Sequence, residues 1–483
     1  MKHELYSTKY GSFDSGSAWM FWIVPAPALA LALLRVLGVM PRSFDWVRMD
    51  VLGAVFLFFI AVLGTAVFRF ADRQMRQDPQ RDRFLLRLMG TLWAVQGMAV
   101  SGHLLLFFGF WLLTSGGLHR LLEHFASRET ARAVAWEKFL VSRIGDLALG
   151  GALLLLQWKF KTLHLTEIEA ALNAGGTTGP WIPLLLALGA AAKSAQVPFH
   201  AWLPRTLEAP TPVSALLHAG IINAGGFLLV RTWPILQHSE SALLAVTIFG
   251  LLSALWGGLA LLVQTDVKRR LAWSTVGQMG FMMIEIGLGA PALALVHLMG
   301  HGLYKAHAFL WSGSPSIAAA PPRPDVNAPS RRIFGVCLWG LLGVVLVTLG
   351  SKVAENFTLS LVVWAALLPL VASGWTRWHQ AGPSTLLGTL VMAAGPWLAL
   401  GAGLALGLSG ASPEIGSLRF IAGLTAAVLV AGAGLIAAFP DLFARWSWYR
   451  HGYAAALHGF AFGRWPDEVI WGLRPRRREN PQP

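Results

Sequence analysis

Ionisable side chains stand inside apolar stretches of this sequence, where a lipid bilayer makes charge expensive. His297, His301 and Lys305 follow one another at intervals of four residues in VHLMGHGLYKAH, which places all three on one face of a helix. Polar residues inside membrane helices are functional candidates, because a central Lys or Asp costs about 2.5–3.5 kcal/mol to insert. Three interpretations are open: proton relay by groups that titrate near neutral pH, satisfied polar packing, and a metal site on the histidine pair. The helix offers no Cys, Asp or Glu beside the pair, so we expect a proton relay.

A lysine stands next to a predicted break in another apolar stretch. Lys193 lies in GAAAKSAQVPFHAWLP, five residues before Pro198, and Pro204, Pro210 and Pro212 follow. Broken helices at membrane depth are tolerated where they line a cavity. We therefore expect the helix to unwind near Lys193 and the lysine to take part in proton translocation. The alternative is that Lys193 snorkels to the membrane interface.

Three more ionisable residues belong to the same region. His218 follows Pro212 by about two helical turns and lies inside the next apolar stretch, where it suits packing and relay equally well. Arg143 and Asp146, in VSRIGDLALG, are one turn apart and are expected to form a structural charge pair. Asp146 is also a candidate for proton translocation as the counter-charge of Lys193.

The elements that must position these residues are membrane helices. Of 483 residues, 55% are hydrophobic and 13% are charged, whereas soluble domains carry roughly 25% charged residues. The composition excludes a soluble globular enzyme and predicts an all-α polytopic membrane protein with about 14 transmembrane helices of roughly 20 residues each. The predicted spans are 19–40, 51–71, 84–101, 102–118, 138–158, 181–197, 211–231, 243–263, 271–289, 293–312, 333–350, 357–373, 384–409 and 418–439.

The same reading divides the chain into an N-terminal segment, a membrane region and a tail. Residues 1–18 precede the transmembrane region 19–440, and residues 313–332, rich in Pro and Ala, form a connector inside it. Residues 19–40 lack a small-residue cleavage site and are expected to remain in the mature protein. Residues 441–483, rich in Trp, Arg and Pro, are expected to form an interfacial helix and a basic end.

Charge in the loops predicts the orientation. Loop Lys and Arg residues, among them Lys268, Arg269 and Arg270, gather on one face, which the positive-inside rule assigns to the cytoplasm. Both termini are therefore expected to be cytoplasmic, in a bacterial cytoplasmic (inner) membrane. The rule also accounts for 38 Lys and Arg against 24 Asp and Glu, so no nucleic-acid binding is expected. A single cysteine, Cys337, excludes an intramolecular disulfide and a Cys-based metal cluster. We expect no cofactor in this chain.

Residues 138–313 resemble a known family. The strings GAAAKSAQVPFHAWLPRTLEAPTPVSALLHAG, LVQTDVKRRLAWSTVGQMGF and HLMGHGLYKAHAFLWSGS are similar to the proton-translocating antiporter-like subunits of respiratory complex I (subunit L) and of Mrp antiporters. The resemblance implies inverted five-helix repeats, broken helices and a polar axis that carries protons. By this resemblance, Lys193 corresponds to the lysine of the family's first broken helix and His218 to its bridging residue. The central axis corresponds to His297, His301 and Lys305. Lys352, in TLGSKVAEN, resembles the lysine of a later FSKD-like segment.

One departure from the family narrows the choice among its members. The family's glutamate that pairs with the broken-helix lysine is missing, because LLLFFGFWLLTSGG has Trp111 or Leu112 at that point. Asp146 replaces it, or the proton transfer is coupled differently. The chain is also shorter than the complex I and Mrp subunits, has no cofactor motif and carries a tail rich in Trp and Arg. Together with the missing glutamate, these features make it most similar to DabB-type subunits of complexes that accumulate dissolved inorganic carbon.

The DabB-type resemblance implies a partner and a division of labour. Ion flow through this chain, of H⁺ with Na⁺ left open, would energise a soluble DabA-like zinc protein on the cytoplasmic face that converts CO₂ to bicarbonate. The zinc would belong to that partner, since this chain has no Cys₂His set. A complex I-like or Mrp-like cation/proton translocating assembly and a non-conducting membrane anchor are the alternatives. The candidate docking residues are Arg323, Arg331, Arg332, Arg445 and Arg450.

Overall fold

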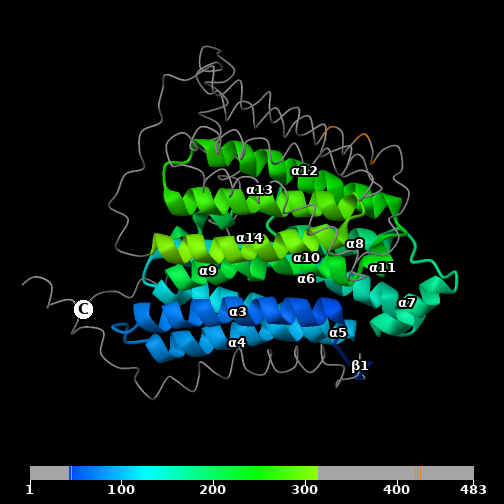
Figure 1. Ribbon diagram of the computed structural model, residues 1–483, viewed down its shortest axis with the longest axis horizontal. Coiled ribbons are helices and arrows are strands. Elements are labelled where there is room, and N and C mark those ends of the chain that lie inside the picture. Colours follow the sequence, from blue (N-terminus) through cyan, green and yellow to red (C-terminus); the bar gives the residue numbers. More distant parts are fainter. Residues whose placement is uncertain (1–42, 45, 314–418, 420, 422–424, 426–483) are drawn as a thin grey trace, which may run out of the picture. The chain divides into compact units, whose positions relative to one another are not determined.

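The computed structural model describes residues 43–44, 46–313, 419, 421 and 425. The chain divides into two compact units, Met1–Leu121 and Leu122–Pro483, and helices make up most of the described part of each (Figure 1). The predicted span 19–40, the connector beyond Gly313 and nearly all residues of the spans after it lie outside the described residues, as does the tail 441–483.

The described part of the first unit is a small hairpin followed by three helices. Strands β1 (Ser43–Phe44) and β2 (Val47–Arg48) pair antiparallel. Helices α3 (Val51–Gln74), α4 (Arg81–Val100) and α5 (Leu104–Leu122) follow, close to the predicted spans 51–71, 84–101 and 102–118. Asp50 begins α3 by accepting a hydrogen bond from the Gly53 N–H at 2.8 Å, a side-chain cap of the usual kind.

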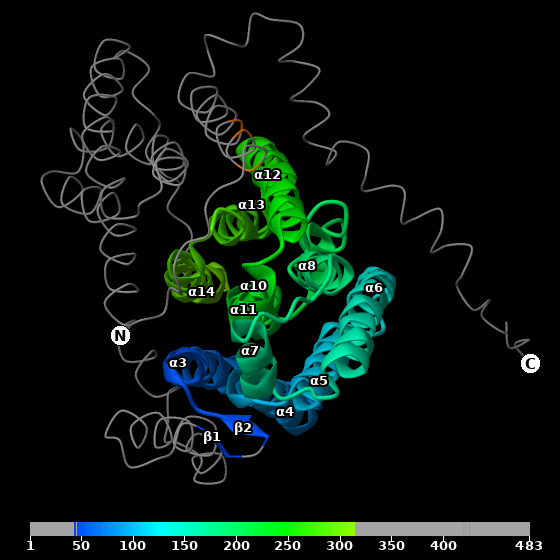
Figure 2. The same ribbon diagram turned by 90° about the vertical axis from the view of Figure 1, so that its right-hand side faces the viewer.

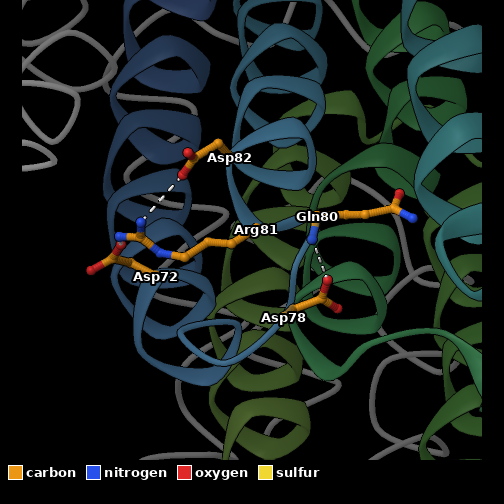
Figure 3. A network of polar contacts seen from close by, with 5 residues as sticks. All are labelled: Asp72, Asp78, Gln80, Arg81 and Asp82. Carbon is orange, nitrogen blue, oxygen red and sulfur yellow. Dashed lines mark hydrogen bonds and ion pairs between the residues drawn. The ribbon is translucent and has the colours of Figure 1, made fainter.

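Charged side chains fix the turn between α3 and α4. The guanidinium of Arg81 lies 2.5 Å from Asp72 and 3.2 Å from Asp82, and the Gln80 N–H donates to Asp78 at 2.7 Å (Figure 3). Asp72 stands near the end of α3, and Arg81 and Asp82 begin α4. These contacts hold the two helix ends together where the chain reverses.

The second unit carries most of the ionisable residues singled out above. Its helices are α6 (Glu129–Phe160), α7 (Leu165–Asn173), α8 (Trp181–Lys193), α9 (Thr211–Ala219), α10 (Ala224–Arg231), α11 (Trp233–Leu236), α12 (Glu240–Val263), α13 (Val267–Gly287) and α14 (Pro291–Ser312). Every residue of α9 and α10 is buried. Seen along the helices, α10 lies among α8, α13 and α14 (Figure 2).

Two predicted spans in this unit are broken, and a third begins earlier. The span 181–197 ends at Lys193, and the span 211–231 is interrupted after Ala219 by a 3₁₀ turn, Ile221–Asn223, that separates α9 from α10. Helix α6 starts at Glu129, nine residues before the predicted 138. The predicted span contained only the apolar part of the helix, and charged residues precede that part. The short helix α7 was not predicted.

Small residues let α12 and α13 approach each other closely. A Cβ on Gly257 would lie 2.4 Å from the Gly277 nitrogen, and a Cβ on Gly280 would lie 2.5 Å from the Ala254 nitrogen. Asp266 begins α13 by accepting from the Arg269 N–H at 2.7 Å. This packing fixes α13 between α12 and α14, where its Thr275 and Glu285 are buried.

Five helical segments among the described residues are long and apolar enough to cross a membrane. They are Val51–Gln74, Leu104–Phe125, Glu129–Phe160, Thr211–Arg231 and Glu240–Val263. The chain is therefore a multi-pass membrane protein with a mostly helical fold, as predicted, although the count of 14 helices extends into residues outside the described range.

Candidate functional site

Lys193 is the last residue of α8 and lies at a break in the helix. Only 8% of the residue is exposed, and α8 packs against α6. Beyond it, the hydroxyl of Ser194 donates to the Ile222 carbonyl at 2.9 Å, and the Val197 N–H donates to the hydroxyl of Ser253 at 2.9 Å. The backbone released by the break is thus tied to the 3₁₀ turn between α9 and α10 and to α12, and Lys193 is held inside the unit.

Helix α6 presents charges to Lys193. Arg143 and Asp146 form an ion pair of 2.6 Å in which the arginine side chain is 41% exposed and the aspartate 9%. Lys193 interacts electrostatically with both, and the buried Lys138 interacts with Lys193 and with the pair. Two buried lysines therefore lie around one buried carboxylate at the interface of α6 and α8.

His218 lies in α9 and contacts α13 and α14. The residue is 1% exposed, and its Nδ1 is 3.1 Å from the hydroxyl of Thr275. Its ring stacks on Phe309, with 4.4 Å between the centroids, and it interacts electrostatically with Lys305. His218 is thereby fixed between the broken-helix region and the helix that carries the other histidines.

Lys305 is completely buried in α14. Its Nζ donates to the Leu271 carbonyl at 2.6 Å and to the hydroxyl of Ser274, both in the first two turns of α13. A charged group inside a membrane protein needs such partners, because an ammonium without acceptors is very costly to bury. The contacts hold the amine of Lys305 in place.

His301 lies one turn before Lys305 and is 8% exposed. Neither of its ring nitrogens has a hydrogen-bond partner within the described part of the chain. It interacts electrostatically with Lys305, His297 and His218, and its ring centroid is 6.4 Å from that of His297. His301 is therefore placed between the other titratable groups with both ring nitrogens available.

His297 ends the series and is paired with α13. Its Nδ1 lies 3.0 and 3.1 Å from the two carboxylate oxygens of Glu285, and its Nε2 lies 2.8 Å from Oε1 of Gln278. Glu285 is 6% exposed, whereas 20% of the His297 side chain is exposed.

We call five of the predicted titratable residues the polar axis: Lys193, His218, Lys305, His301 and His297. The last four interact with one another, and Lys193 lies at the helix break, where the next residue, Ser194, contacts the 3₁₀ turn after α9. The polar axis runs from the end of α8 to α9 and α14. Helix α9 packs against α14, and α10, which follows α9 in the chain, packs against both α8 and α14 (Figure 2). Spacings of four residues do place His297, His301 and Lys305 along one side of α14, toward α13 and α9. The arrangement has the geometry of a proton relay, although the role of each residue stays a prediction.

Other predicted residues fall elsewhere. Lys352 and the five candidate docking arginines, Arg323, Arg331, Arg332, Arg445 and Arg450, lie outside the described residues. Trp111, at the point of the missing glutamate, is fully buried in α5 of the first unit.

The sequence reading missed Glu285, Gln278 and Lys138. Glu285 is a single carboxylate inside the apolar run MMIEIG, which is itself a signal at membrane depth. Lys138 is the first residue of the predicted span 138–158, so the sequence did not indicate that it lies inside a longer helix. Among the described residues no three His, Cys, Asp or Glu side chains are grouped to hold a metal ion.

Comparison with known proteins gives the same family as the motifs. Residues 101–322 match the family model described as NADH:quinone oxidoreductase/Mrp antiporter, transmembrane. This part of the chain is a membrane domain of that family. The solved Mrp complex from Dietzia sp. DQ12-45-1b shares the fold, with a TM-score of 0.54 at 24% identity, covering 94% of this chain and 52% of that one.

Curated relatives include carbon transporters and complex I subunits. The probable inorganic carbon transporter subunit DabB of Hydrogenovibrio crunogenus is 39% identical over 299 residues, 59% of this chain and 58% of the relative. NADH-quinone oxidoreductase subunit L of Mycobacterium tuberculosis is 35% identical over 359 residues, covering 72% of this chain and 55% of that subunit. The chain therefore spans little more than half the length of either relative.

Proposed function

We propose that this chain is a proton-translocating membrane subunit that energises the uptake of inorganic carbon, as CO₂ or bicarbonate. The observation that carries the proposal is the polar axis, a series of titratable groups on α8, α9 and α14 that are buried except for His297, inside a domain of the antiporter family. The inorganic carbon cargo is supported by the similarity to the probable carbon transporter subunit DabB.

In this proposal the axis carries protons by changes of charge at fixed positions. Lys193 accepts or releases a proton beside Asp146, and His218 connects the broken-helix region to Lys305. His301 receives the proton on a ring nitrogen that has no partner among the described residues, and His297 completes the series.

The carbon chemistry belongs to a partner in this proposal. We infer a soluble DabA-like zinc protein on the cytoplasmic face, with carbonic-anhydrase-like chemistry at its zinc, which ion flow through this chain drives in one direction. The chain would then lie in the bacterial inner membrane with both termini in the cytoplasm, and the five candidate docking arginines would contact the partner. Similarity to complex I subunit L and to the Mrp fold makes a cation/proton translocating assembly the second candidate.

The test is uptake of labelled inorganic carbon in cells that express the full chain together with its partner gene. Lys193→Ala should reduce uptake to the level of cells without the chain, and a protonophore should do the same to the wild type. Lys159→Ala is the control, because Lys159 is exposed at the end of α6 and should leave uptake unchanged.

Other outcomes choose among the alternatives. Uptake that does not depend on the gene pair would favour a respiratory or antiporter assembly. Uptake that needs both genes but ignores Lys193→Ala and the protonophore would make the chain a membrane anchor and overturn the proposal.

A further inference from the structure

The last turn of α13 carries a buried carboxylate that no motif of the sequence reading included. Glu285 is 6% exposed, and both of its carboxylate oxygens lie within 3.1 Å of Nδ1 of His297. A carboxylate at membrane depth needs a partner of opposite charge or a proton of its own. His297 is the titratable group that faces it from α14.

The second ring nitrogen of His297 also faces oxygen. Its Nε2 lies 2.8 Å from Oε1 of Gln278, which is seven residues, or two turns, before Glu285 on α13. With acceptors at both nitrogens, the ring donates twice, as only an imidazolium can. A neutral ring that keeps its proton on Nδ1 would need the Gln278 amide turned over, so that its NH₂ group donates to Nε2.

These three side chains therefore have two self-consistent states that differ by one proton. In one, an imidazolium lies between the Glu285 carboxylate and the Gln278 oxygen. In the other, a neutral imidazole donates to Glu285 and accepts from Gln278. The passage between them forms or breaks one N–H bond at Nε2 and turns one amide, and both ring nitrogens of His297 keep a partner in both states.

The group also stands at one end of the polar axis. Eight residues separate His297 from Lys305 on α14, about 12 Å along the helix, and His301 lies halfway. Lys305 contacts the beginning of α13, close to the basic residues after Asp266, whereas Glu285 is near the opposite end of that helix. His297 is the one axis residue that is not buried, with 20% of its side chain exposed.

We propose that Glu285 is an ion-translocation residue, which with His297 and Gln278 forms the terminal proton-holding site of the polar axis, at the end away from the basic α12–α13 loop. Glu285 balances the charge of the imidazolium while the proton is held, and Gln278 turns when the proton leaves. Within the part of the chain that the structure describes, the titratable groups that face His297 are Glu285 from α13 and His301 from α14. This role in transport rests on the proposed function, but the protonation of the site does not.

The protonation is tested by infrared spectroscopy of the purified full chain in lipid nanodiscs near neutral pH. The difference between wild type and His297→Gln should contain an imidazolium band. The same difference in a Glu285→Gln background should lack it, because the ring then has no counter-charge. An imidazolium band that persists without Glu285, or that is missing from the wild type, would overturn the proposal.

The role in transport is tested in the uptake assay above. Glu285→Gln should lower uptake by about 100-fold, the usual scale for loss of a positioned proton-transfer group, and Glu285→Asp should restore a large part of it. Glu167→Gln, which removes an exposed carboxylate on α7, should have no effect. Loss of uptake in Lys193→Ala with full uptake in Glu285→Gln would refute this role alone, whereas full uptake in both would refute the proposed function.

Discussion

Replacing Lys305 by methionine should abolish transport and leave the fold intact. Lys305 is the most deeply buried cation of the polar axis, and its Nζ donates to the Leu271 carbonyl and to the Ser274 hydroxyl. Methionine has a similar length and flexibility, so it fills the same space without the charge. The substitution separates the chemistry of the site from its packing.

The expected change in stability is small because two contributions nearly cancel. Hydrogen bonds from a charged group contribute about 1.5–3 kcal/mol, and removing a lysine from membrane depth returns about 2.5–3.5 kcal/mol. The acceptors are not left alone, since the Leu271 carbonyl also accepts from the hydroxyls of Thr275 at 2.9 Å and Ser274 at 3.2 Å. The two hydrogen bonds together contribute about 3–6 kcal/mol, so the unfolding free energy should fall by about 1–2 kcal/mol at the centre of these ranges.

The effect on transport should be much larger. Without the amine, a proton must pass between His218 and His301 with no titratable group to hold it, and the rate should fall by about 100-fold or more. The assay is uptake of labelled inorganic carbon, with thermal unfolding of the purified variant in detergent measured in parallel and Lys159→Met as the control. A well-folded Lys305→Met chain with near wild-type uptake would refute the relay.

Two further substitutions test the packing of the site and its counter-charge. Gly257→Ala should push α12 away from α13, because its Cβ would meet backbone at 2.4 Å, and should destabilise the protein by about 1–3 kcal/mol. Gly258→Ala, with nothing within 4 Å of its Cβ, is the matched control, and equal melting temperatures would contradict the close crossing. Asp146→Asn should lower uptake strongly and destabilise the chain by less than the roughly 3–5 kcal/mol of a fully buried pair, because Arg143 is 41% exposed. Wild-type uptake in that variant would exclude Asp146 as the counter-charge of Lys193.

The helix breaks show what local sequence can predict. Prolines after Lys193 predicted the end of α8, since proline removes a donor and clashes with the preceding turn. The interruption between α9 and α10 has no internal proline, although Gly220 and Asn223 lie in it. It is stabilised by contacts that sequence spacing does not reveal: the Asn223 side chain donates to the Ala219 carbonyl at 2.6 Å, and Ser194 donates to Ile222 from another segment.

Part of the candidate site could also be predicted from local sequence, whereas another part depends on contacts between helices. Spacings of four residues predicted the shared face of His297, His301 and Lys305, because helical periodicity alone determines it. The partners of these residues lie on α13, and which residues meet across two helices depends on their crossing angle and offset. Glu285 and Gln278 were missed for that reason. The one signal that the sequence offers for Glu285 is its position as a single carboxylate in the apolar run MMIEIG.

His301 gives the strongest argument that the polar axis is more than polar packing. A buried histidine kept for structure is expected to have hydrogen bonds at its ring nitrogens, because an unsatisfied buried polar group costs about 1–3 kcal/mol. His218 and His297 have such partners, whereas His301 has none at either nitrogen among the described residues. A relay needs a base whose nitrogen is open to the next proton, and His301 lies between Lys305 and His297, where that proton would arrive and leave. Among the described residues, the open ring nitrogens of His301 would be a cost in a scaffold and would suit a base that takes up a proton.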